Sequence, residues 1–358
     1  MAKRGNNSIM ASEYSTHILV IRLSAMGDVA MTVPVLSGLV GQYPNVRVTV
    51  LTRSFFAPLF HGIPNVEVYT ADVKGRHKGI VGLFRLFKEL KNLHIDAVAD
   101  LHHVLRSTIL KNYFKLTNIP FVQMDKGRAE KKALTSVKNK NFKPLKSTHQ
   151  RYADVFSQLG FPIHLELVTP VFKKDMAPTT HNLVGPKNEK WIGIAPFAAF
   201  EGKMYPLPQM YKVIKSLNDS LNTKILLFGG GKKEVEQLEV WATEFENCVN
   251  IAGKIPFQEE LSVISHLDLM VAMDSGNAHL AAIYGIPTIT IWGVTHPYAG
   301  FYPFGQDMDH GLLADRTKYP FIPTSVYGNK FPKGYENVME TITSEAVIVK
   351  VNLVLNGA

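Results

Sequence analysis

Short apolar runs alternate with amphipathic stretches along most of the 358-residue chain, and this order constrains its fold more than any other feature. In the first half the runs lie at 17–23, 46–52, 66–72 and 95–102, with an amphipathic helix expected at 81–93. In the second half we expect strands at 191–197, 223–230, 268–275 and 287–293, and helices at 207–221, 232–245, 256–267 and 277–284. Strands and helices in alternation predict parallel sheets with helices on both faces.

A polar segment with proline and glycine, residues 173–190, separates the two runs of alternation. It predicts a linker, so the chain is expected to divide into two doubly wound α/β domains near residue 180. We expect an N-terminal domain at 1–180, a C-terminal domain at 181–343 and a last helix within 344–358. In such sheets ligands bind beyond the carboxyl ends of the strands, so the loops that follow strands are the places to search.

The amino-acid composition limits the cellular compartments and the classes of binding partner that we expect. The chain has one cysteine, so no intrachain disulfide forms, which fits a reducing cytoplasm. Its first 16 residues lack the apolar centre of a signal peptide, and no run approaches the ~20 apolar residues that span a bilayer. The formal net charge is +9, and nine Lys or Arg stand against one acid at 126–151. This segment is either a solvated loop or a patch for a phosphorylated or lipid partner; nucleic-acid motifs are missing.

The loop after the first strand, RLSAMGD at 22–28, places an acid beside a glycine at the start of a helix. Gly27 and the small residues around it let the backbone approach a ligand closely. From the residues alone, Asp28 is a helix cap, a ribose clamp or a catalytic base. A nucleotide-dependent oxidoreductase is disfavoured, because G-x-G-x-x-G follows none of the expected strands.

Loops in the second half carry groups that suit an anion. Ser275 and Gly276 open a helix directly after Asp274, so backbone N–H groups and the helix dipole there favour a diphosphate. His279 lies one turn further along and adds a donor, unless it is a core histidine. Lys203, on a loop after another strand, is either a phosphate partner or a surface lysine.

Two further residues are expected beside the same nucleotide. Glu234 begins the helix after the strand at 223–230, where it complements the helix dipole or hydrogen-bonds a ribose. Thr295 follows the strand at 287–293. We expect no metal, since the nucleotide half has no D-x-D after a strand and the adjacent His102 and His103 do not share a face.

Three segments together resemble glycosyltransferase family 9, the ADP-heptose:lipopolysaccharide heptosyltransferases. ILVIRLSAMGDVAMTVPVL at 18–36 is similar to the family's first strand, glycine loop and acid. DLHHVLRS at 100–107 is similar to its acceptor-side segment, and MDSGNAHLAAIYGIPTITIWGVTHP at 273–297 to its donor-binding signature. The resemblance implies a GT-B fold, two Rossmann-like domains facing across a cleft, in which the last helix often crosses back to the first domain.

The resemblance also implies an activity and a setting. It implies inverting, metal-independent transfer of heptose from ADP-heptose to the inner core of lipopolysaccharide, on an acceptor of the Kdo–lipid A type. No cofactor is implied beyond the nucleotide-sugar donor. The implied location is the cytoplasmic face of the inner membrane, with peripheral contact with anionic lipid and no nucleic acid as partner.

Roles follow for individual residues that match the family's pattern. Asp28 is implied as the general base. The residues implied to bind the donor are Lys203, Glu234, Asp274, Ser275, Gly276 and His279, and Thr295 is expected from its position to line the same pocket. The residues expected on the acceptor side are Ser24, Gly27, Arg106, Lys138 and Lys140.

The chain departs from the family pattern at 319–343, where many members carry cysteines and this sequence has none. Two alternatives stay open. One keeps the fold and mechanism but uses another nucleotide sugar or another cell-surface glycan acceptor. The other is a non-catalytic protein that binds a nucleotide sugar. The sequence gives no indication of the oligomeric state.

Overall fold

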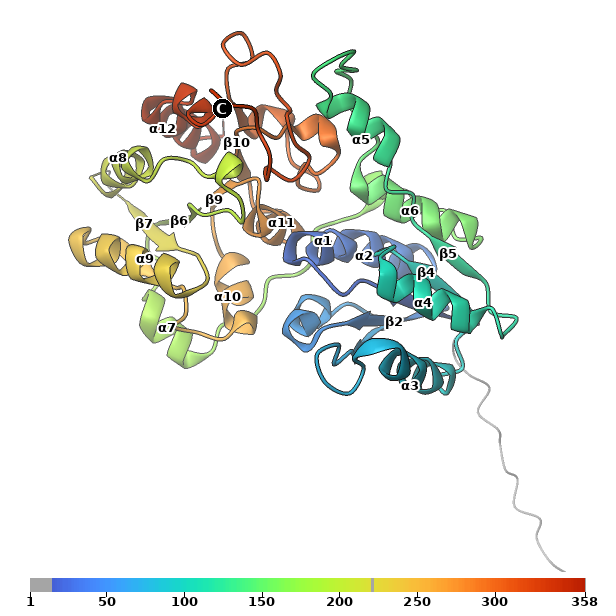
Figure 1. Cartoon of the computed structure of the whole chain (residues 1–358). Coiled ribbons are helices and arrows are strands. Elements are labelled where there is room, and N and C mark those ends of the chain that lie inside the picture. Colours follow the sequence, from blue (N-terminus) through green and yellow to red (C-terminus); the bar gives the residue numbers. More distant parts are fainter. Residues whose placement is uncertain (1–14, 220–221, 358) are drawn as a thin grey trace, which may run out of the picture. The chain divides into compact units, whose positions relative to one another are not determined.

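The computed structural model describes residues 15–219 and 222–357, and most of the polar N-terminal segment discussed above lies outside these ranges (Figure 1). Contacts between Cα atoms divide the chain into two compact units, each assembled from separate stretches. Of the described residues, 15–24, 36–124 and 153–164 form the first unit, and 25–35, 125–152, 165–219 and 222–357 form the second. The division expected near residue 180 differs from this one, because it falls inside the second unit.

The first unit is built on a parallel sheet with the strand order β3-β2-β1-β4-β5. Its strands are β1 (Thr16–Ile21), β2 (Val46–Thr52), β3 (Val66–Thr70), β4 (Ala97–Asp100) and β5 (Phe121–Gln123). Its helices are α3 (Gly79–Lys91), α4 (Leu105–Phe114) and the C-terminal parts of α2 (Thr32–Gln42) and α6 (Thr148–Gln158).

Both faces of the first sheet are covered. Leu19 and Ile21 of β1 share a buried cluster with Leu86 of α3. Ile18 and Val20, which alternate with them along the strand, are fully buried as well. Because successive side chains of a strand point to opposite faces, apolar side chains pack on each side, as the alternation predicted.

The second unit is built on a parallel sheet with the strand order β11-β10-β9-β6-β7-β8. Its strands are β6 (Lys190–Ala195), β7 (Thr223–Leu227), β8 (Cys248–Asn250), β9 (Leu269–Met273), β10 (Thr288–Trp292) and β11 (Gly311–Leu313). Its helices are α1 (Met26–Ala30), α5 (Arg128–Thr135), α7 (Pro178–Val184), α8 (Leu207–Asn218), α9 (Lys232–Glu244), α10 (Phe257–Ile264), α11 (Gly276–Ile283) and α12 (Ser344–Leu355).

The central strands of the second sheet end at the same level. Ala195, the last residue of β6, pairs with Ala272 of β9, and Met273 of β9 pairs with Ile291 of β10. The loops that follow these strands therefore emerge side by side at one edge. This edge carries most of the residues that we expected to bind a donor.

Two outer parts of the second unit differ in how they meet the expectations. α12 packs against α8 and β9, and its Val347 and Val351 are buried in the core of the second unit. The expected return of this helix to the first domain stays a prediction. The expected linker contains α7. Glu259 holds that helix in place by accepting hydrogen bonds from the Ala177 N–H at 2.9 Å and the Thr180 hydroxyl at 2.8 Å.

The basic segment 126–151 belongs to the second unit and contains α5, so it is not a loop throughout, although several of its cations are exposed. Arg151, buried on α6, forms ion pairs with Glu130 at 2.5 Å and with Asp125 at 3.4 Å. Further along, the Leu145 N–H donates to the Tyr298 carbonyl at 2.9 Å. Part of the positive charge therefore serves internal contacts.

Candidate active site

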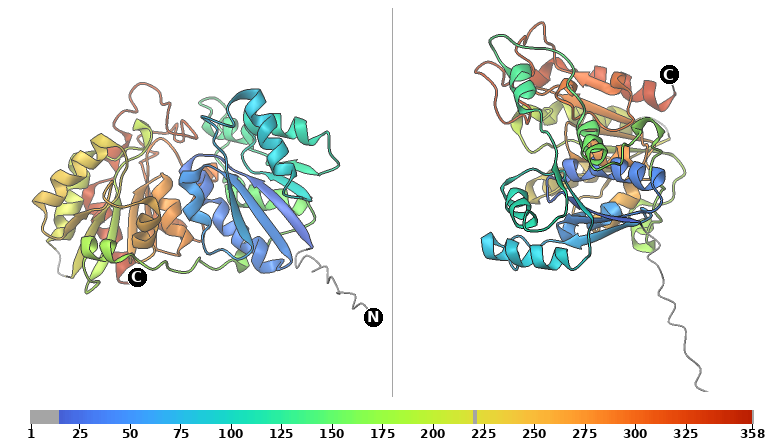
Figure 2. Two further views of the ribbon diagram at one scale, coloured as in Figure 1. Left: turned by 90° about the horizontal axis from the view of Figure 1, so that it is seen from below. Right: turned by 90° about the vertical axis from the view of Figure 1, so that its right-hand side faces the viewer.

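α1 packs directly against α11 within the second unit, and Figures 1 and 2 show the blue helix beside the orange one. A Cβ atom at Gly27 would lie 2.9 Å from Cδ2 of His279 and 3.4 Å from Cα of Gly276. The helices approach this closely because residue 27 has no side chain. Gly27 therefore has a packing role, which the sequence did not indicate, and Asp28 beside it belongs to the unit that carries the donor loops.

Asp28 lies in the first turn of α1, but it is not the N-cap. Ala25 occupies that position, and the Asp28 carboxylate accepts a hydrogen bond from the Ala25 N–H at 3.4 Å. The Asp28 carbonyl accepts from the Tyr152 hydroxyl at 3.3 Å. The side chain of Asp28 is half-buried.

Lys131 on α5 is a neighbour of Asp28 that sequence reasoning missed. Burial lowers the pKa of Lys131 to about 8; Arg151 lowers it further, while the negative charge of Asp28 opposes the shift. The ammonium also lies 4.3 Å from the ring centroid of Phe301. Lys131 therefore contributes positive charge near the candidate base, although its place in the basic segment gave no sign of this.

Three buried polar atoms at the start of α11, and a fourth in the loop after β10, have no hydrogen-bond partner among the described residues. They are Oγ of Ser275, Oδ1 of Asn277, Nδ1 of His279 and Oγ1 of Thr295. Ser275 is the N-cap of α11, and Thr295 follows the neighbouring strand β10. Buried polar groups are almost always hydrogen-bonded in native proteins, so this set points to a polar ligand at the edge of the sheet. Asn277 is a further member that the sequence analysis did not single out.

His279 is buried, yet its environment differs from that of an ordinary core histidine. Burial lowers its pKa to about 4, Lys203 contributes in the same direction, and the charges of Asp274 and Asp28 oppose the shift. The ring is therefore neutral near pH 7 and acts through hydrogen bonding. Its unsatisfied Nδ1 supports the interpretation that it contacts a ligand.

Lys203 is not the surface lysine of the alternative interpretation. Its ammonium lies 2.8 Å from Oδ2 of Asp274 and donates to the Asp274 carbonyl at 2.9 Å, and the two side chains are 15% and 6% exposed. The short 3-10 helix Glu201–Lys203 carries it, and the Val294 N–H anchors that helix by donating to the Gly202 carbonyl at 2.9 Å. The structure thus brings Lys203 and Asp274 together at the start of α11.

Glu234 lies further along the same sheet edge. Its carboxylate accepts the Gly230 N–H at 2.7 Å, which fits the helix-capping interpretation and leaves other lone pairs available. It follows β7, and the order β10-β9-β6-β7 places the two outer strands about 14 Å apart at the usual strand spacing. A row from Thr295 past Lys203 to Glu234 therefore suits an extended ligand, and the ribose contact stays a prediction.

The residues expected on the acceptor side are not all exposed cations. Lys140 donates to the carbonyls of Leu134 and Pro323 at 2.7 and 2.9 Å, and burial lowers its pKa to about 8. Two of the three N–H donors of this ammonium therefore serve the fold, and its acceptor role stays a prediction. Lys138 is exposed on the second unit, while the exposed Arg106 and the half-buried Ser24 belong to the first. Their roles stay predictions.

Within residues 15–219 and 222–357, no three His, Cys, Asp or Glu side chains form a cluster that would hold a metal ion. The two adjacent histidines diverge: the Leu23 N–H donates to His102 Nδ1 at 3.4 Å, whereas His103 Nδ1 donates to the Met124 carbonyl at 2.8 Å. In the same two stretches of chain, every helix is too short or too polar to cross a membrane.

Comparisons with known proteins identify the family of the chain. The family model for glycosyltransferase family 9 (heptosyltransferase) matches residues 83–321. The chain is 25% identical over 298 residues to the lipopolysaccharide core heptosyltransferase OpsX of Haemophilus influenzae. The alignment covers 80% of this chain and 81% of that protein.

Solved structures show the same fold. A glycosyl transferase family 9 protein from Veillonella parvula matches with a TM-score of 0.72 and 19% identity, over 96% of this chain and 98% of its own. The ADP-heptose lipopolysaccharide heptosyltransferase II of E. coli matches with a TM-score of 0.68 and 19% identity, over 96% and 99%. These similarities confirm the GT-B fold that the resemblance implied. The family model spans more than half of the sequence, including the loops around α11, and the chain therefore belongs to glycosyltransferase family 9.

Proposed function

We propose that this glycosyltransferase moves a heptose from ADP-heptose to the inner core of lipopolysaccharide, with inversion at the anomeric carbon and without a metal or cofactor. The relatives' names supply the sugar and the acceptor class. The observation that carries the proposal is the set of four unsatisfied buried polar atoms at the start of α11 and in the loop after β10, in the unit that also holds Asp28.

The donor's diphosphate fits the start of α11. Free N–H groups and the positive end of the helix dipole lie there, and Lys203 supplies a full positive charge beside them. Neutral His279 and the Ser275 hydroxyl donate hydrogen bonds to the same oxygens. Together these groups stabilise the negative charge that grows on the departing ADP, which is the task a metal ion performs in other transferases.

Asp28 is the proposed general base. Its carboxylate takes the proton from the acceptor hydroxyl as that oxygen attacks the anomeric carbon. The new glycosidic C–O bond forms while the bond from the anomeric carbon to the diphosphate oxygen breaks, and ADP leaves with the electron pair. Attack from the side opposite the leaving group inverts the configuration.

The proposed acceptor is a Kdo–lipid A type glycolipid at the cytoplasmic face of the inner membrane. Such an acceptor carries phosphates and carboxylates, which suit the exposed cations Arg106 and Lys138. The enzyme then contacts the anionic membrane peripherally, because the described helices are too short to cross it.

The test compares wild type with Asp28→Asn, using Asp309→Asn as a control at an exposed carboxylate. ADP binding is followed by calorimetry, and transfer from ADP-heptose to Kdo–lipid A by mass spectrometry. We expect unchanged ADP affinity and a loss of turnover of at least about 100-fold for Asp28→Asn only. Near wild-type turnover of Asp28→Asn would show that this carboxylate only supports the start of α1.

The alternatives give distinct results in the same assay. Efficient transfer from a different nucleotide sugar, or to a different glycan, identifies the other donor or acceptor. Nucleotide binding without transfer to any acceptor identifies a non-catalytic binder. Loss of transfer in excess chelator, restored by magnesium or manganese, contradicts metal independence, and NMR of the product's anomeric centre decides between inversion and retention.

A further inference from the structure

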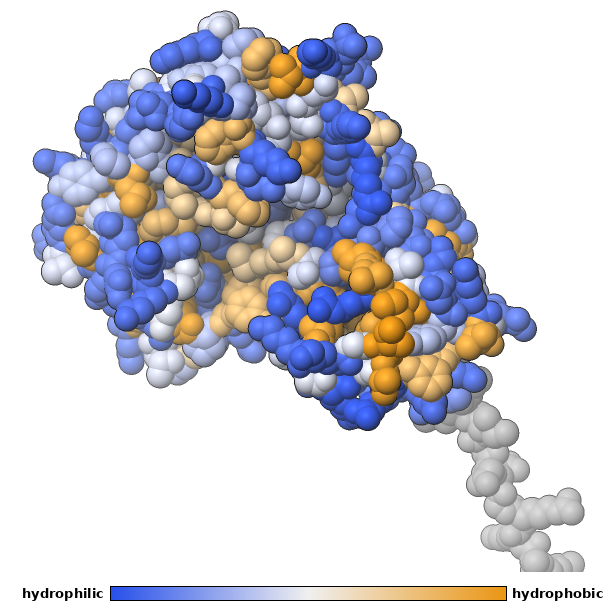
Figure 3. All heavy atoms as spheres, in the orientation of Figure 1, coloured by the Kyte–Doolittle hydropathy of each residue, from blue (hydrophilic) through white to orange (hydrophobic). Residues whose placement is uncertain are grey.

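Large apolar side chains gather on the surface of α3 and α4 in the first unit. Ile80, Val81 and Leu105 are 68%, 76% and 77% exposed, and Phe84 is 39% exposed. Figure 3 shows a continuous orange band over the place that α3 and α4 occupy in Figure 1. Single exposed apolar residues are common, but a contiguous group marks a surface that another apolar phase covers. We call these four residues the apolar band.

The apolar band is additional to the face that α3 uses for folding. Leu83, Leu86, Phe87 and Leu90 of the same helix are buried against the first sheet. The first turns of α3 thus carry apolar side chains on the buried face and on the solvent-exposed face. A helix that only packs against its own core normally has polar side chains on the exposed face. The outward residues therefore serve something other than the packing of this unit.

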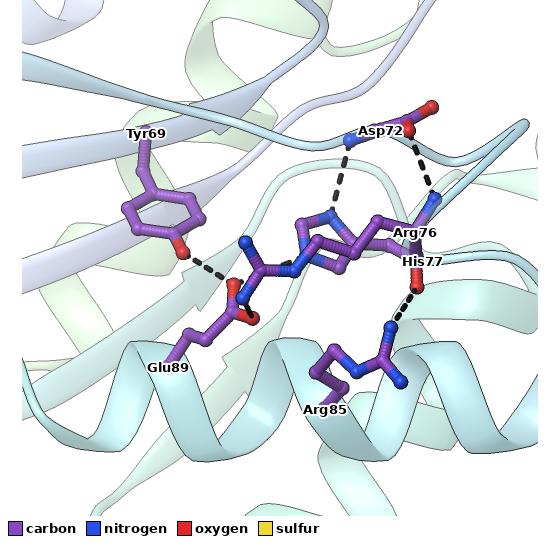
Figure 4. Close-up of polar contacts among 6 residues, drawn as sticks. All are labelled: Tyr69, Asp72, Arg76, His77, Arg85 and Glu89. Carbon is purple, nitrogen blue, oxygen red and sulfur yellow. Dashed lines mark hydrogen bonds and ion pairs between the residues drawn. The ribbon is translucent and has the colours of Figure 1, made fainter.

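A polar network fixes the loop that leads into α3, as Figure 4 shows. The Tyr69 hydroxyl donates to Glu89 at 2.5 Å, and His77 Nε2 donates to the same carboxylate at 3.0 Å. His77 Nδ1 accepts the Asp72 N–H at 3.1 Å, and Arg76 pairs with Glu89. The loop is therefore held by several bonds to the helix that presents the apolar band.

Close packing holds the same turn of α3. A Cβ atom at Gly82 would lie 2.5 Å from the carbonyl carbon of His77, so the loop rests directly on the helix backbone. The Tyr113 hydroxyl of α4 donates to the Ile80 carbonyl at 3.2 Å, and its ring lies edge-on to Phe84 with centroids 5.3 Å apart. The apolar band is thus displayed on a rigid support.

The surroundings of the apolar band are strongly basic. The stretches 72–91 and 102–115 hold nine Lys or Arg and two carboxylates, Asp72 and Glu89. Both carboxylates are engaged: Glu89 in the network above, and Asp72 with the N–H groups of Gly75 and Arg76. Exposed cations therefore flank the apolar side chains, and Lys88 lies 4.9 Å from the ring centroid of Phe84.

We propose that the apolar band and its flanking cations form a docking surface for an anionic lipid bilayer. Ile80, Val81, Phe84 and Leu105 enter the boundary between headgroups and acyl chains, while Lys78, Arg85 and Lys88 contact lipid phosphates. This inference rests on the proposed function in one respect, that a lipid-borne acceptor is the reason for docking. It places the main contact on α3 and α4, whereas the sequence suggested the segment 126–146.

The test measures binding of the full-length protein to phosphatidylglycerol-containing vesicles and to pure phosphatidylcholine vesicles by flotation. We expect wild type to prefer the anionic vesicles, and Ile80→Ser/Val81→Ser to reduce the partition coefficient by at least about tenfold. Arg85→Gln/Lys88→Gln should weaken binding and flatten its dependence on salt. Val240→Ser, at a 58% exposed valine of α9, is the matched control and should bind as wild type does.

Two further measurements keep the outcomes distinct. Thermal unfolding and ADP binding should be unchanged in all variants, since these side chains are exposed and lie outside the proposed catalytic site. Vesicle binding by Ile80→Ser/Val81→Ser equal to wild type overturns the proposal. The proposal is also overturned if wild type binds no vesicles but self-associates, and Ile80→Ser/Val81→Ser abolishes that self-association. Failure of the proposed function appears separately, as absence of transfer to a deacylated, water-soluble acceptor despite intact vesicle binding.

Discussion

Replacing Lys203 by methionine tests whether its ammonium holds the donor diphosphate or only supports Asp274. Methionine keeps the length of the apolar stem and removes the charge. In the structure the ammonium contacts both a carboxylate oxygen and the carbonyl of Asp274, at 2.8 and 2.9 Å. The substitution therefore leaves a carboxylate that is 6% exposed without its cation.

The expected loss of stability follows from this burial. Removing one partner of a buried ion pair costs about 3 to 5 kcal/mol. We expect a value near the lower end, because Asp274 directly precedes the positive end of α11. A loss of about 3 kcal/mol lowers the Tm of a unit of this size by about 6 to 12 °C.

The partner substitution separates the two roles of Lys203. Asp274→Asn removes the carboxylate charge but keeps the shape, and the main-chain carbonyl of residue 274 still accepts from the ammonium, so we expect a smaller loss than for Lys203→Met, about 1 to 3 kcal/mol. It also removes the carboxylate that competes with phosphate for the ammonium, so ADP should bind more tightly. Lys203→Met should instead weaken ADP binding by about 10- to 100-fold, the value of one charge-assisted hydrogen bond.

Thermal unfolding and calorimetric titration with ADP, applied to both single variants and the double variant, check these values. The reasoning is wrong if Lys203→Met loses stability but binds ADP as tightly as wild type, since the lysine would then serve only the fold. It is also wrong if Asp274→Asn weakens ADP binding as much as Lys203→Met does.

Three further predictions concern packing, acid and thiol chemistry. Gly27→Ala should lower the free energy of unfolding in urea by about 1 to 3 kcal/mol, because its methyl would lie 2.9 Å from the His279 ring. Gly276→Ala should lower it less, because the new methyl would meet the movable end of the Met26 side chain. Burial lowers the pKa values of His149 and His279 from 6.5 to about 3 and about 4, so the unfolded chain binds more protons in acid. Stability should be insensitive to these groups above pH 6.5 and fall as the pH drops from 6.5 towards 4, and His149→Gln should flatten the fall in a pH series of denaturation curves. Burial raises the pKa of Cys248 to about 12, so a thiol reagent should modify it only as fast as the chain opens, and rapid modification of the native protein would contradict its burial.

The longer elements could be predicted from the sequence for a simple physical reason. The strand expected at 46–52 coincides with β2, because Val46, Val48 and Val50 alternate along it and are buried on one face of the sheet. The three short strands β5 (Phe121–Gln123), β8 (Cys248–Asn250) and β11 (Gly311–Leu313) were missed. Three residues are too few to show a period, and only the pairing with a neighbouring strand defines them.

The residues of the candidate site likewise fall into those that the sequence pattern indicates and those that only the tertiary packing reveals. Asp274 and His279 could be found because they follow a recognisable strand and helix start. Lys131 could not, since its position near Asp28 depends on how α5 packs, far away in the sequence. The contacts of Lys140 could not be predicted for the same reason: a lysine that donates to two main-chain carbonyls looks like an exposed one in the sequence until the tertiary contacts are known.

The second unit is discontinuous in sequence, and this restricts how the gene can recombine with those of relatives. α1 and α11 lie about 250 residues apart in the sequence, yet they pack together where Gly27 of α1 faces His279 of α11. A single crossover near the middle of the gene would join α1 of one parent to α11 of the other and place a foreign side chain at that contact. A chimaera preserves the match only when residues 25–35 and 125–152 are inherited together with the long C-terminal stretch. Donor and acceptor preferences in such a protein are therefore expected to diverge by point substitution around a matched pair of helices more readily than by exchange of halves.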